Sequence, residues 1–295
     1  MSKKAIGCGQ ITWMTGEQTW TADEVLAEIA TAGYEGAPAG PGGLSVEEAK
    51  AQFAAHGLRP APGYLSGEFW NQNEEAALLE RAHAFGAFSQ ALGITEVYVA
   101  ANGFDGFVTS RGQTRSQVSG HVTEADSMTD TEFDQFAKTL TRVGEITLGY
   151  GLRSCFHNHV GSTIETRAEI DRLFSLVDRD VVFMGPDTGH LEWAGTDALD
   201  FCRDYADSIL TIHVKDIDRA VLAEGVAAEW DYKTFSDHGI WTELGRGAID
   251  FPALFGILDN AGFDGWIIVE TDVTQLASPL ESAMVSRAYL KRIGM

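Results

Sequence analysis

Four short segments in the second half of the chain each end an apolar, strand-like run on side chains that bind divalent metal ions. They are CFHNH (155–159), FMGPDTGH (183–190), ILTIHVKD (209–216) and GWIIVETD (265–272). An amphipathic stretch long enough for a helix separates each segment from the next. In a parallel α/β barrel the carboxyl ends of the strands converge on one mouth, so side chains distant in sequence could share one ion there.

The candidate ligands are carboxylates and imidazoles. Asp187 precedes Thr-Gly-His, His213 follows the apolar run ILTI, and Glu270 follows WIIV. His157 and His159 end the first segment, and strand alternation directs both toward the same side, either the barrel axis or the helices. A mixed nitrogen and oxygen set suits Mn²⁺, Co²⁺, Fe²⁺ or Zn²⁺ better than Mg²⁺, which favours oxygen ligands.

Each of these side chains also has a purely structural interpretation. An Asp before Thr-Gly is often a turn or helix-cap residue, and a His at a strand end is often an ordinary buried polar group. Glu270 and Lys215 could simply pair with neighbouring charges. A shared site is favoured because four consecutive strand ends all carry ligand-type side chains.

Strand-like and helix-like stretches alternate along the chain, which predicts an α/β fold. Eight such pairs with no linker between them predict one domain over residues 1–295, a single (β/α)8 TIM barrel. An open doubly wound sheet is the alternative, but GCGQIT in the first strand departs from the dinucleotide-binding GxGxxG pattern. Strands are expected at 5–13, 34–40, 58–65, 94–102, 152–159, 181–187, 209–215 and 265–270.

Helix signals support this division. Thr21 with Glu24 forms a capping box before the helix that Gly33 ends, and Pro252 lies in the first turn of a helix that begins near Asp250. Two irregular insertions, 103–127 and 217–242, interrupt the pattern. The first is long for a connection inside a compact domain and is a candidate lid.

The composition indicates which kinds of molecule the protein could bind. The net charge is -22 and the isoelectric point is about 4.6, which disfavours binding to nucleic acid or to anionic membranes. Three scattered cysteines without a CxxC motif fit a reducing compartment. No apolar run approaches the length of a membrane span. We therefore expect a cytoplasmic protein that acts on a small molecule, without nucleic-acid or membrane partners.

The same segments resemble the xylose-isomerase-like TIM-barrel superfamily of sugar isomerases and epimerases, and within it they are most similar to inosose dehydratases. The similarity covers nearly the whole chain. It is carried by ITW (11–13), AGYEG (32–36), HNHVGSTIETRAEIDRL (157–173), DTGHL (187–191), HVKD (213–216), LGRGAIDFP (244–252) and GFDGWIIVETD (262–272).

This resemblance implies one metal ion, with Mn²⁺ expected, held by His157, Asp187, His213 and Glu270. His159 and Glu165 remain alternatives for the ligand from the fifth strand. The His-Asn-His sequence stands where ketose epimerases carry a Glu, which counts against a two-glutamate epimerase. The segment YEGAPAG (34–40) lacks the Glu that relatives usually place after strand two, so substrate contacts there are in doubt.

A divalent ion bound to a ketone oxygen favours removal of the α-proton. If the strand ends assemble at one mouth, Glu270, His159 and His190 are the candidate bases, and Lys215 or His190 is the candidate acid. Substrate contacts are expected from Asn158, His190, Lys215 and an aromatic at the mouth, with Trp13 at the end of strand one favoured. The other aromatics considered are Trp20, Phe69, Trp70, Tyr98, Phe104, Trp193 and Trp266.

The leading prediction is a divalent-metal-dependent lyase of the inosose dehydratase type, acting on a keto-cyclitol or keto-sugar. The alternatives are a ketose 3-epimerase or sugar isomerase, and the catalytic subunit of a C-glycoside deglycosidase acting by β-elimination from a 3-keto C-glycoside. The protein could form a homo-oligomer or bind a small second subunit. The acidic charge disfavours an endonuclease of the same superfamily. Three costly polar groups converging on one site disfavour a barrel that only binds sugar.

Overall fold

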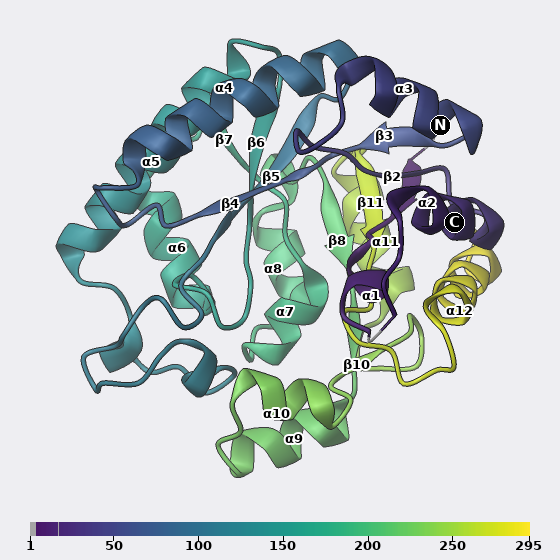
Figure 1. Cartoon of the computed structure of the whole chain (residues 1–295). Coiled ribbons are helices and arrows are strands. Elements are labelled where there is room, and N and C mark those ends of the chain that lie inside the picture. The colour runs from purple at the N-terminus through teal and green to yellow at the C-terminus, as the bar shows by residue number, and fades with distance from the viewer. Residues whose placement is uncertain (1–3, 17) are drawn as a thin grey trace.

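The computed structural model describes residues 4–16 and 18–295, and its barrel strands run parallel in two sheets (Figure 1). The strands are buried along most of their length, as expected where helices cover a parallel sheet. The five-stranded sheet has the order β3 (Arg59–Ala61), β2 (Gly36–Pro38), β1 (Ala5–Cys8), β11 (Trp266–Val269) and β8 (Ile212–Val214). The four-stranded sheet has the order β4 (Tyr64–Gly67), β5 (Glu96–Ala101), β6 (Arg153–His157) and β7 (Val182–Met184).

The two sheets are joined on both sides. On one side β3 and β4 are two halves of one strand, interrupted at Pro62, which has no N–H to donate to a ladder. Gly63 continues the contact, because its carbonyl accepts from the amide of Tyr98. On the other side, isolated parallel bridges join Met184 to Ile209 and Asp187 to His213. The result is the eight-strand arrangement of the predicted (β/α)8 TIM barrel.

Helices follow the strands and cover the outside of the barrel (Figure 1). The expected start signals are present: Thr21 and Glu24 form a capping box, and the Asp250 side chain caps the helix that contains Pro252 in its first turn. The helices between and after the barrel strands include α2 (Ala22–Ala32), α3 (Val46–Ala55), α4 (Glu75–Leu92), α5 (Asp130–Leu148), α6 (Arg167–Leu176), α8 (Ala198–Asp204), α11 (Phe251–Asn260) and α12 (Pro279–Arg292).

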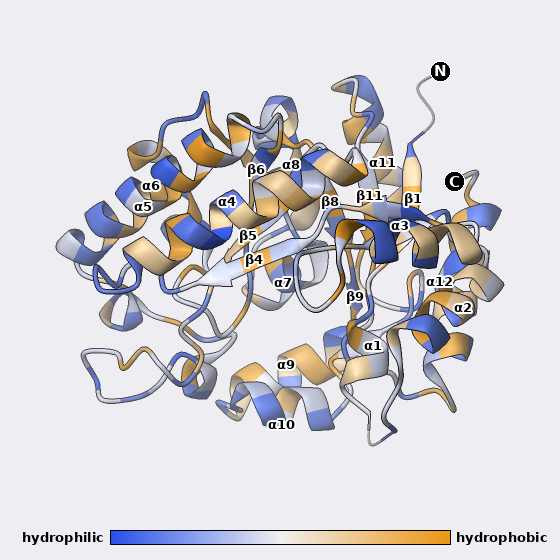
Figure 2. Ribbon diagram, turned by 45° about the horizontal axis from the view of Figure 1, so that its top comes forward, coloured by the Kyte–Doolittle hydropathy of each residue, from blue (hydrophilic) through white to orange (hydrophobic). Residues whose placement is uncertain are grey.

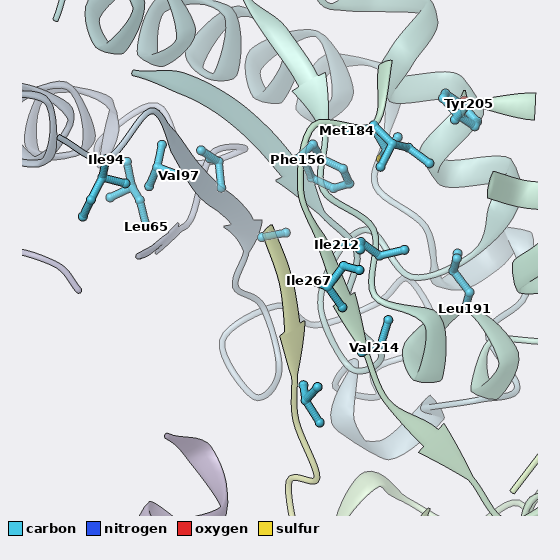
Figure 3. Close-up of a cluster of buried hydrophobic side chains, with 14 of the residues drawn as sticks. Leu65, Ile94, Val97, Phe156, Met184, Leu191, Tyr205, Ile212, Val214 and Ile267 are labelled. Carbon is cyan, nitrogen blue, oxygen red and sulfur yellow. The ribbon is translucent and has the colours of Figure 1, made fainter. Parts of the chain in front are cut away.

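The main core lies between strands and helices (Figure 3). In β6, Phe156 packs against Phe136 of α5 and Phe174 of α6, with ring centroids 6.3 and 5.9 Å away. Since side chains alternate along a strand, the adjacent His157 points into the barrel, where its ring lies 5.4 Å from that of Tyr98. The packing of one phenylalanine against the helices therefore fixes the direction of the histidine.

The expected first strand was too long. Strand one ends at Cys8 rather than continuing to residue 13, and the short helix α1 (Ile11–Met14) follows it. The segment after β7 is a further short helix, α7 (Thr188–Trp193), and Asp187 is its N-cap, one of the structural interpretations of an Asp before Thr-Gly. Among the described residues, no helix is both long and apolar enough to cross a membrane.

The two insertions are structured. Residues 103–127 contain the 3-10 turns η1 (Ser116–Val118) and η2 (Glu124–Asp126), and Arg115 there is fully buried. Residues 217–242 contain α9 (Arg219–Ala227), α10 (Tyr232–Asp237) and β10 (Trp241–Thr242), which pairs antiparallel with β9 (Asp216–Ile217). Figures 1 and 2 show α1, α9 and α10 gathered at the same end of the barrel.

Candidate active site

Four strand ends bring the expected ligand side chains to one place. His157 is the last residue of β6, His213 lies within β8, and Glu270 directly follows β11. Asp187 follows β7 and is paired in register with His213 of the neighbouring strand. This adjacency follows from the order of the sheet, in which sequence-distant strands are neighbours.

The atoms that face one another are nitrogens and carboxylate oxygens. Asp187 Oδ2 lies 3.7 Å from His213 Nδ1 and 3.9 Å from His157 Nε2. Glu270 Oε2 lies 3.1 Å from His213 Nδ1. His157 Nδ1 lies 3.2 Å from the carbonyl of Gly185 and therefore carries the ring proton, which leaves Nε2 as the atom with a free lone pair.

Asp187 has two roles at once. Its Oδ1 caps α7 by accepting from the amides of Gly189 and His190 at 3.0 and 3.1 Å. Its Oδ2 is buried with no hydrogen-bond partner among the described residues, and so are both ring nitrogens of His213. Burial raises the pKa of Asp187 to about 6, while the charge of Lys215 opposes that shift.

Buried polar atoms without partners are costly and rare, and they commonly mark an ion site. His157, Asp187 and His213 each offer one ligand atom, and these atoms all lie within 4.8 Å of one another. Glu270 adds a carboxylate beside His213. The donor set of two imidazoles and two carboxylates therefore fits a divalent transition-metal ion.

Gly9, which has no side chain, leaves the space that the Glu270 carboxylate occupies. A Cβ on Gly9 would lie 2.0 Å from Glu270 Oε1, so any larger residue after β1 would displace this carboxylate. Burial raises the pKa of Glu270, but the adjacent His213 ring and the charge of Lys215 more than offset this and hold it well below its usual range. Glu270 is therefore a carboxylate anion at neutral pH.

Lys215 is a buried cation beside the candidate ligands. Its Nζ lies 2.6 Å from Asp272 Oδ1, 3.1 Å from Glu270 Oε2 and 3.4 Å from Asp187 Oδ2. Burial lowers its pKa, but these three carboxylates outweigh that effect and hold the pKa well above its ordinary value. A buried charge of this kind persists only when it is paired, so Lys215 and Asp272 act as one charge-balanced unit.

A second group of ligand-type side chains, His159, His190 and Asp272, lies beside the first. The ammonium of Lys215 is close to this group, 3.3 Å from His190 Nε2. Because it already supplies a positive charge there, Lys215 disfavours a second ion among these three residues.

His159 lies just beyond β6, and its ring faces the cavity. Its Nδ1 lies 2.7 Å from the carbonyl of Val160 and so carries the proton, leaving Nε2 as a proton acceptor. Burial lowers the pKa of His159 to about 3, and the charge of Lys215 adds to the shift. At neutral pH His159 is therefore an uncharged imidazole, 3.6 Å from the ring of His190.

A cavity of about 560 Å³ is lined in part by His157, His159, His213, Lys215 and Glu270. The remaining wall comes from strand ends and from the loops that follow them. It comprises Gln10, Ile11, Met14, Thr15, Pro38, Pro62, Tyr64, Ser66, Tyr98, Ala101, Asn102, Phe104, Tyr232, Ser236, Asp272 and Val273.

Three of the sequence-predicted contacts are corrected by the structure. Trp13 is a core residue of α1, and its indole donates to Glu28 at 2.6 Å, while Ile11 and Met14 line the cavity. Asn158 is fully buried, and its Oδ1 accepts from the amide of Asp187 at 3.0 Å. Asn158 therefore positions a candidate ligand rather than contacting substrate.

His190 is also buried behind the cavity wall. Its Nδ1 accepts from the amide of Val160 at 3.3 Å, and its Nε2 lies 3.3 Å from the Lys215 ammonium and 4.0 Å from Asp272 Oδ2. In this position His190 supports the ring of His159. The structure does not place it as a base or as a substrate contact, because both ring nitrogens face other groups of the protein and the side chain does not line the cavity.

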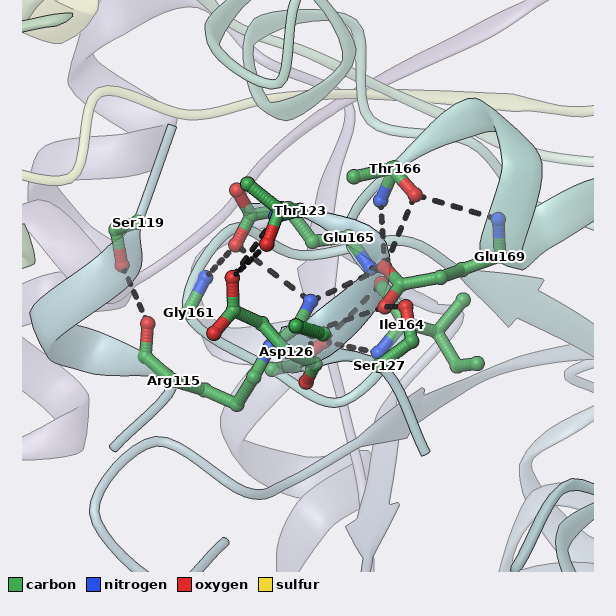
Figure 4. Close-up of polar contacts among 12 residues, drawn as sticks. Arg115, Ser119, Thr123, Asp126, Ser127, Gly161, Ile164, Glu165, Thr166 and Glu169 are labelled. Carbon is green, nitrogen blue, oxygen red and sulfur yellow. Dashed lines mark hydrogen bonds and ion pairs between the residues drawn. The ribbon is translucent and has the colours of Figure 1, made fainter. Parts of the chain in front are cut away.

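Glu165 is not among the clustered ligand side chains and belongs instead to the polar network drawn in Figure 4. Its carboxylate accepts from the amides of Gly120 and Gly161 at 2.8 and 2.7 Å, and lies 4.0 Å from the Arg115 guanidinium. Arg115 in turn forms two hydrogen bonds with Glu169 of α6. Glu165 thus ties the 103–127 insertion to the loop after β6, and is not the fifth-strand ligand.

Sequence reasoning missed several residues of the cavity wall. Tyr64 and Ser66 come from β4, two positions apart on one face, a signal that strand alternation could have revealed. Tyr232 comes from the 217–242 insertion, where nothing in the sequence pattern indicates its direction. Of the aromatics considered for the mouth, Tyr98 and Phe104 do line the cavity.

The chain is similar in sequence and structure to known proteins. A sequence profile described as xylose isomerase-like TIM barrel matches residues 26–293. The chain belongs to this family. It is 26% identical to the inosose dehydratase of Clostridium perfringens over 302 residues, which cover 98% of this chain and 97% of that protein. The predicted resemblance to the superfamily and to inosose dehydratases is confirmed, as is the prediction of a lyase or isomerase/epimerase enzyme.

Solved structures show the same fold. The structure of L-ribulose 3-epimerase matches with a TM-score of 0.70 at 18% identity, covering 99% of this chain and 94% of that one. The structure of the IolI protein, described with a bound zinc atom, matches with a TM-score of 0.69 at 16% identity, covering 98% and 97%. At these identities the likeness establishes the barrel only. The choice between dehydration and epimerisation therefore depends on the residues of this chain.

Proposed function

We propose that this protein is a divalent-metal-dependent lyase that removes the proton α to the carbonyl of a keto-cyclitol or keto-sugar and expels a β-hydroxyl, as an inosose dehydratase does. The observation that carries the proposal is the group of unpartnered, buried atoms at the strand ends: Asp187 Oδ2 and both ring nitrogens of His213. They lie beside an imidazole, a carboxylate anion and a paired lysine at the floor of a cavity.

His157, Asp187, His213 and Glu270 are the residues that would hold the ion. The mixture of imidazole and carboxylate donors favours Mn²⁺, with Co²⁺, Fe²⁺ and Zn²⁺ as alternatives and Mg²⁺ less suited. Such an ion, when bound, polarises a carbonyl oxygen and so acidifies the adjacent C–H bond.

His159 is the proposed base. It is uncharged at neutral pH, it faces the cavity, and its Nε2 is free to accept a proton because Nδ1 is held by Val160. Glu270 is less suited, because its carboxylate lies 3.1 Å from His213 Nδ1 as a candidate ligand. The ring of His190, 3.6 Å away, supports His159 from behind.

Lys215 is the proposed donor to the departing oxygen. Its ammonium lines the cavity and remains charged because three carboxylates surround it. In the proposed step His159 takes the α-proton, the electron pair of that C–H bond forms the α,β double bond, and the β C–O bond breaks. The hydroxyl leaves as water with a proton from Lys215, so no oxidant or reductant is needed.

The discriminating experiment is turnover of scyllo-inosose by the manganese-loaded protein, followed by ultraviolet absorbance of the dione product. We expect loss of one water and growth of that absorbance. Turnover of psicose or tagatose but not of inosose would instead indicate a ketose epimerase. Copurification with a small second chain, together with cleavage of a 3-keto C-glycoside, would indicate a deglycosidase.

A further inference from the structure

The cavity has two chemically different ends. Its floor is formed by strand-end residues and holds the charged and imidazole side chains described above. Its outer wall comes from the loops after the strands and includes five apolar or aromatic side chains, here called the apolar rim: Ile11, Met14, Phe104, Tyr232 and Val273.

The apolar rim is open to solvent. Met14 is 74% exposed, and the other four side chains of the rim are partly exposed. Met14 belongs to α1 and Tyr232 to α10, which lie at the same end of the barrel in Figures 1 and 2. Large apolar groups that stay exposed at the mouth of a functional cavity commonly mark a ligand surface.

Aromatic rings connect the rim to the proposed base. The ring of Tyr232 stacks on that of His159 at 6.1 Å with an interplanar angle of 20°. Phe104 contacts both rings edge-on, at 5.8 Å from Tyr232 and 5.1 Å from His159. A ligand reacting beside His159 would therefore meet aromatic surface on its outward side.

An unsubstituted polyol would use only the floor of the cavity and leave the apolar rim uncovered. Its hydroxyls would find donors and acceptors on the floor, but apolar side chains of the rim would give them no hydrogen bonds, which is costly on desolvation. A cavity of about 560 Å³ is also of the size that encloses a drug-sized ligand rather than a single small ring. Covering the rim with apolar surface would instead be favourable in proportion to the area buried.

We propose that the apolar rim is a subsite for an aromatic substituent, and that the preferred substrate is a conjugate in which such a group is attached to the polyhydroxylated ketone ring. This deepens the proposed function and rests on it for the identity of the ring, while the subsite itself depends only on the rim. Methionine at position 14 suits this role, because its flexible thioether adapts to flat rings of different shape.

Binding without turnover tests the subsite. Phenyl β-D-glucoside and methyl β-D-glucoside share a polyhydroxylated ring and differ in the substituent, and neither is a ketone that the protein could convert. By isothermal titration calorimetry on the manganese-loaded protein, we expect phenyl β-D-glucoside to bind roughly ten-fold more tightly. Met14→Ser should reduce that preference by roughly three- to five-fold.

Met284→Ser is the matched control, because Met284 is also exposed, at 48%, but lies on α12 rather than at the cavity. It should leave both affinities unchanged. Equal affinities for the two glucosides, no binding of the phenyl compound at millimolar concentration, or equal effects of the two methionine variants would overturn the subsite.

Different results would reject the lyase proposal and the subsite proposal. A phenyl preference that depends on Met14, in a protein that converts no keto-cyclitol or keto-sugar, would retain the subsite and reject the lyase. Efficient turnover of free inosose with no phenyl preference would retain the lyase and reject the subsite.

Discussion

Asp187 caps helix α7 with one carboxylate oxygen and leaves the other 3.7 Å from Nδ1 of His213 on the neighbouring strand. The capping bonds fix the direction of the carboxylate, so the free oxygen is held toward the imidazoles even though it has no hydrogen-bond partner among the described residues. A structural role and a ligand role thus coexist in one side chain.

Replacing the proposed base should separate catalysis from metal binding. His159→Gln removes the proton acceptor at the cavity wall but none of the four proposed ligands. We expect kcat to fall by about 10²- to 10⁴-fold, with unchanged metal content and little change in KM. His83→Gln, on the exposed face of α4, is the control. An unchanged kcat in His159→Gln would show that another residue is the base.

Enlarging Gly9 should displace the Glu270 carboxylate without removing any polar group. The new Cβ of Gly9→Ala would lie 2.0 Å from Glu270 Oε1, so the carboxylate must move away from His213. We expect weaker metal binding and a loss of activity of at least about ten-fold. Gly256→Ala has open space around its Cβ and should keep full activity and metal content. Equal behaviour of the two variants would contradict the role assigned to Gly9.

Removing the amide of Asn158 should distinguish positioning from substrate contact. Its side chain holds the backbone of Asp187, and replacing it by alanine leaves those buried groups unpaired. Asn158→Ala should lose about 1–3 kcal/mol of unfolding free energy and bind metal about 10- to 100-fold more weakly. At saturating metal, KM should return to the wild-type value. A KM that stays raised under those conditions would mean that Asn158 contacts substrate.

Glu165 should make stability depend on pH. Burial raises its pKa from 4.5 to about 7, so between these values the folded protein binds this proton more tightly than the unfolded chain does. Its contribution to the unfolding free energy is therefore fully present below about pH 4.5 and declines by about 3 kcal/mol as pH rises to about 7. Urea unfolding of wild type and Glu165→Gln across this range isolates the effect.

As pH rises from about 4.5 to about 7, the unfolding free energy of the wild type should fall relative to that of Glu165→Gln. The exposed Glu80→Gln variant should track wild type at every pH. A difference between wild type and Glu165→Gln that stays constant from pH 4.5 to pH 7 would show that Glu165 does not titrate as its burial implies.

The fold was predictable because its signals are local and repeated. Alternating strand and helix patterns, capping boxes such as that of Thr21, and the Asp250–Pro252 helix start all survive in the structure. The predicted strand at 5–13 was too long because Ile11, Thr12 and Trp13 are as common in strands as the residues before them. A four-residue helix leaves too short a pattern to recognise, so the direction of Trp13 was wrong as well.

The candidate site was predictable only in part. The convergence of His157, Asp187 and His213 follows from strand order, which a barrel imposes. The direction of Asn158 and His190 depends instead on hydrogen bonds to the backbone of Asp187 and Val160, which no sequence pattern encodes. Tyr232 was not predicted because its position depends on how the 217–242 insertion folds back over the barrel.

The measurement that tests the shared ion site most directly is the metal content of the purified protein, by elemental analysis after loading with Mn²⁺ and removal of excess metal. We expect one ion per chain in the wild type, loss of that ion in His213→Ala and in Asp187→Asn, and full retention in His83→Ala. Activity should disappear with the ion and return when Mn²⁺ is restored. A chelated, metal-free protein with full activity, or a His213→Ala variant that retains one ion per chain, would contradict the site.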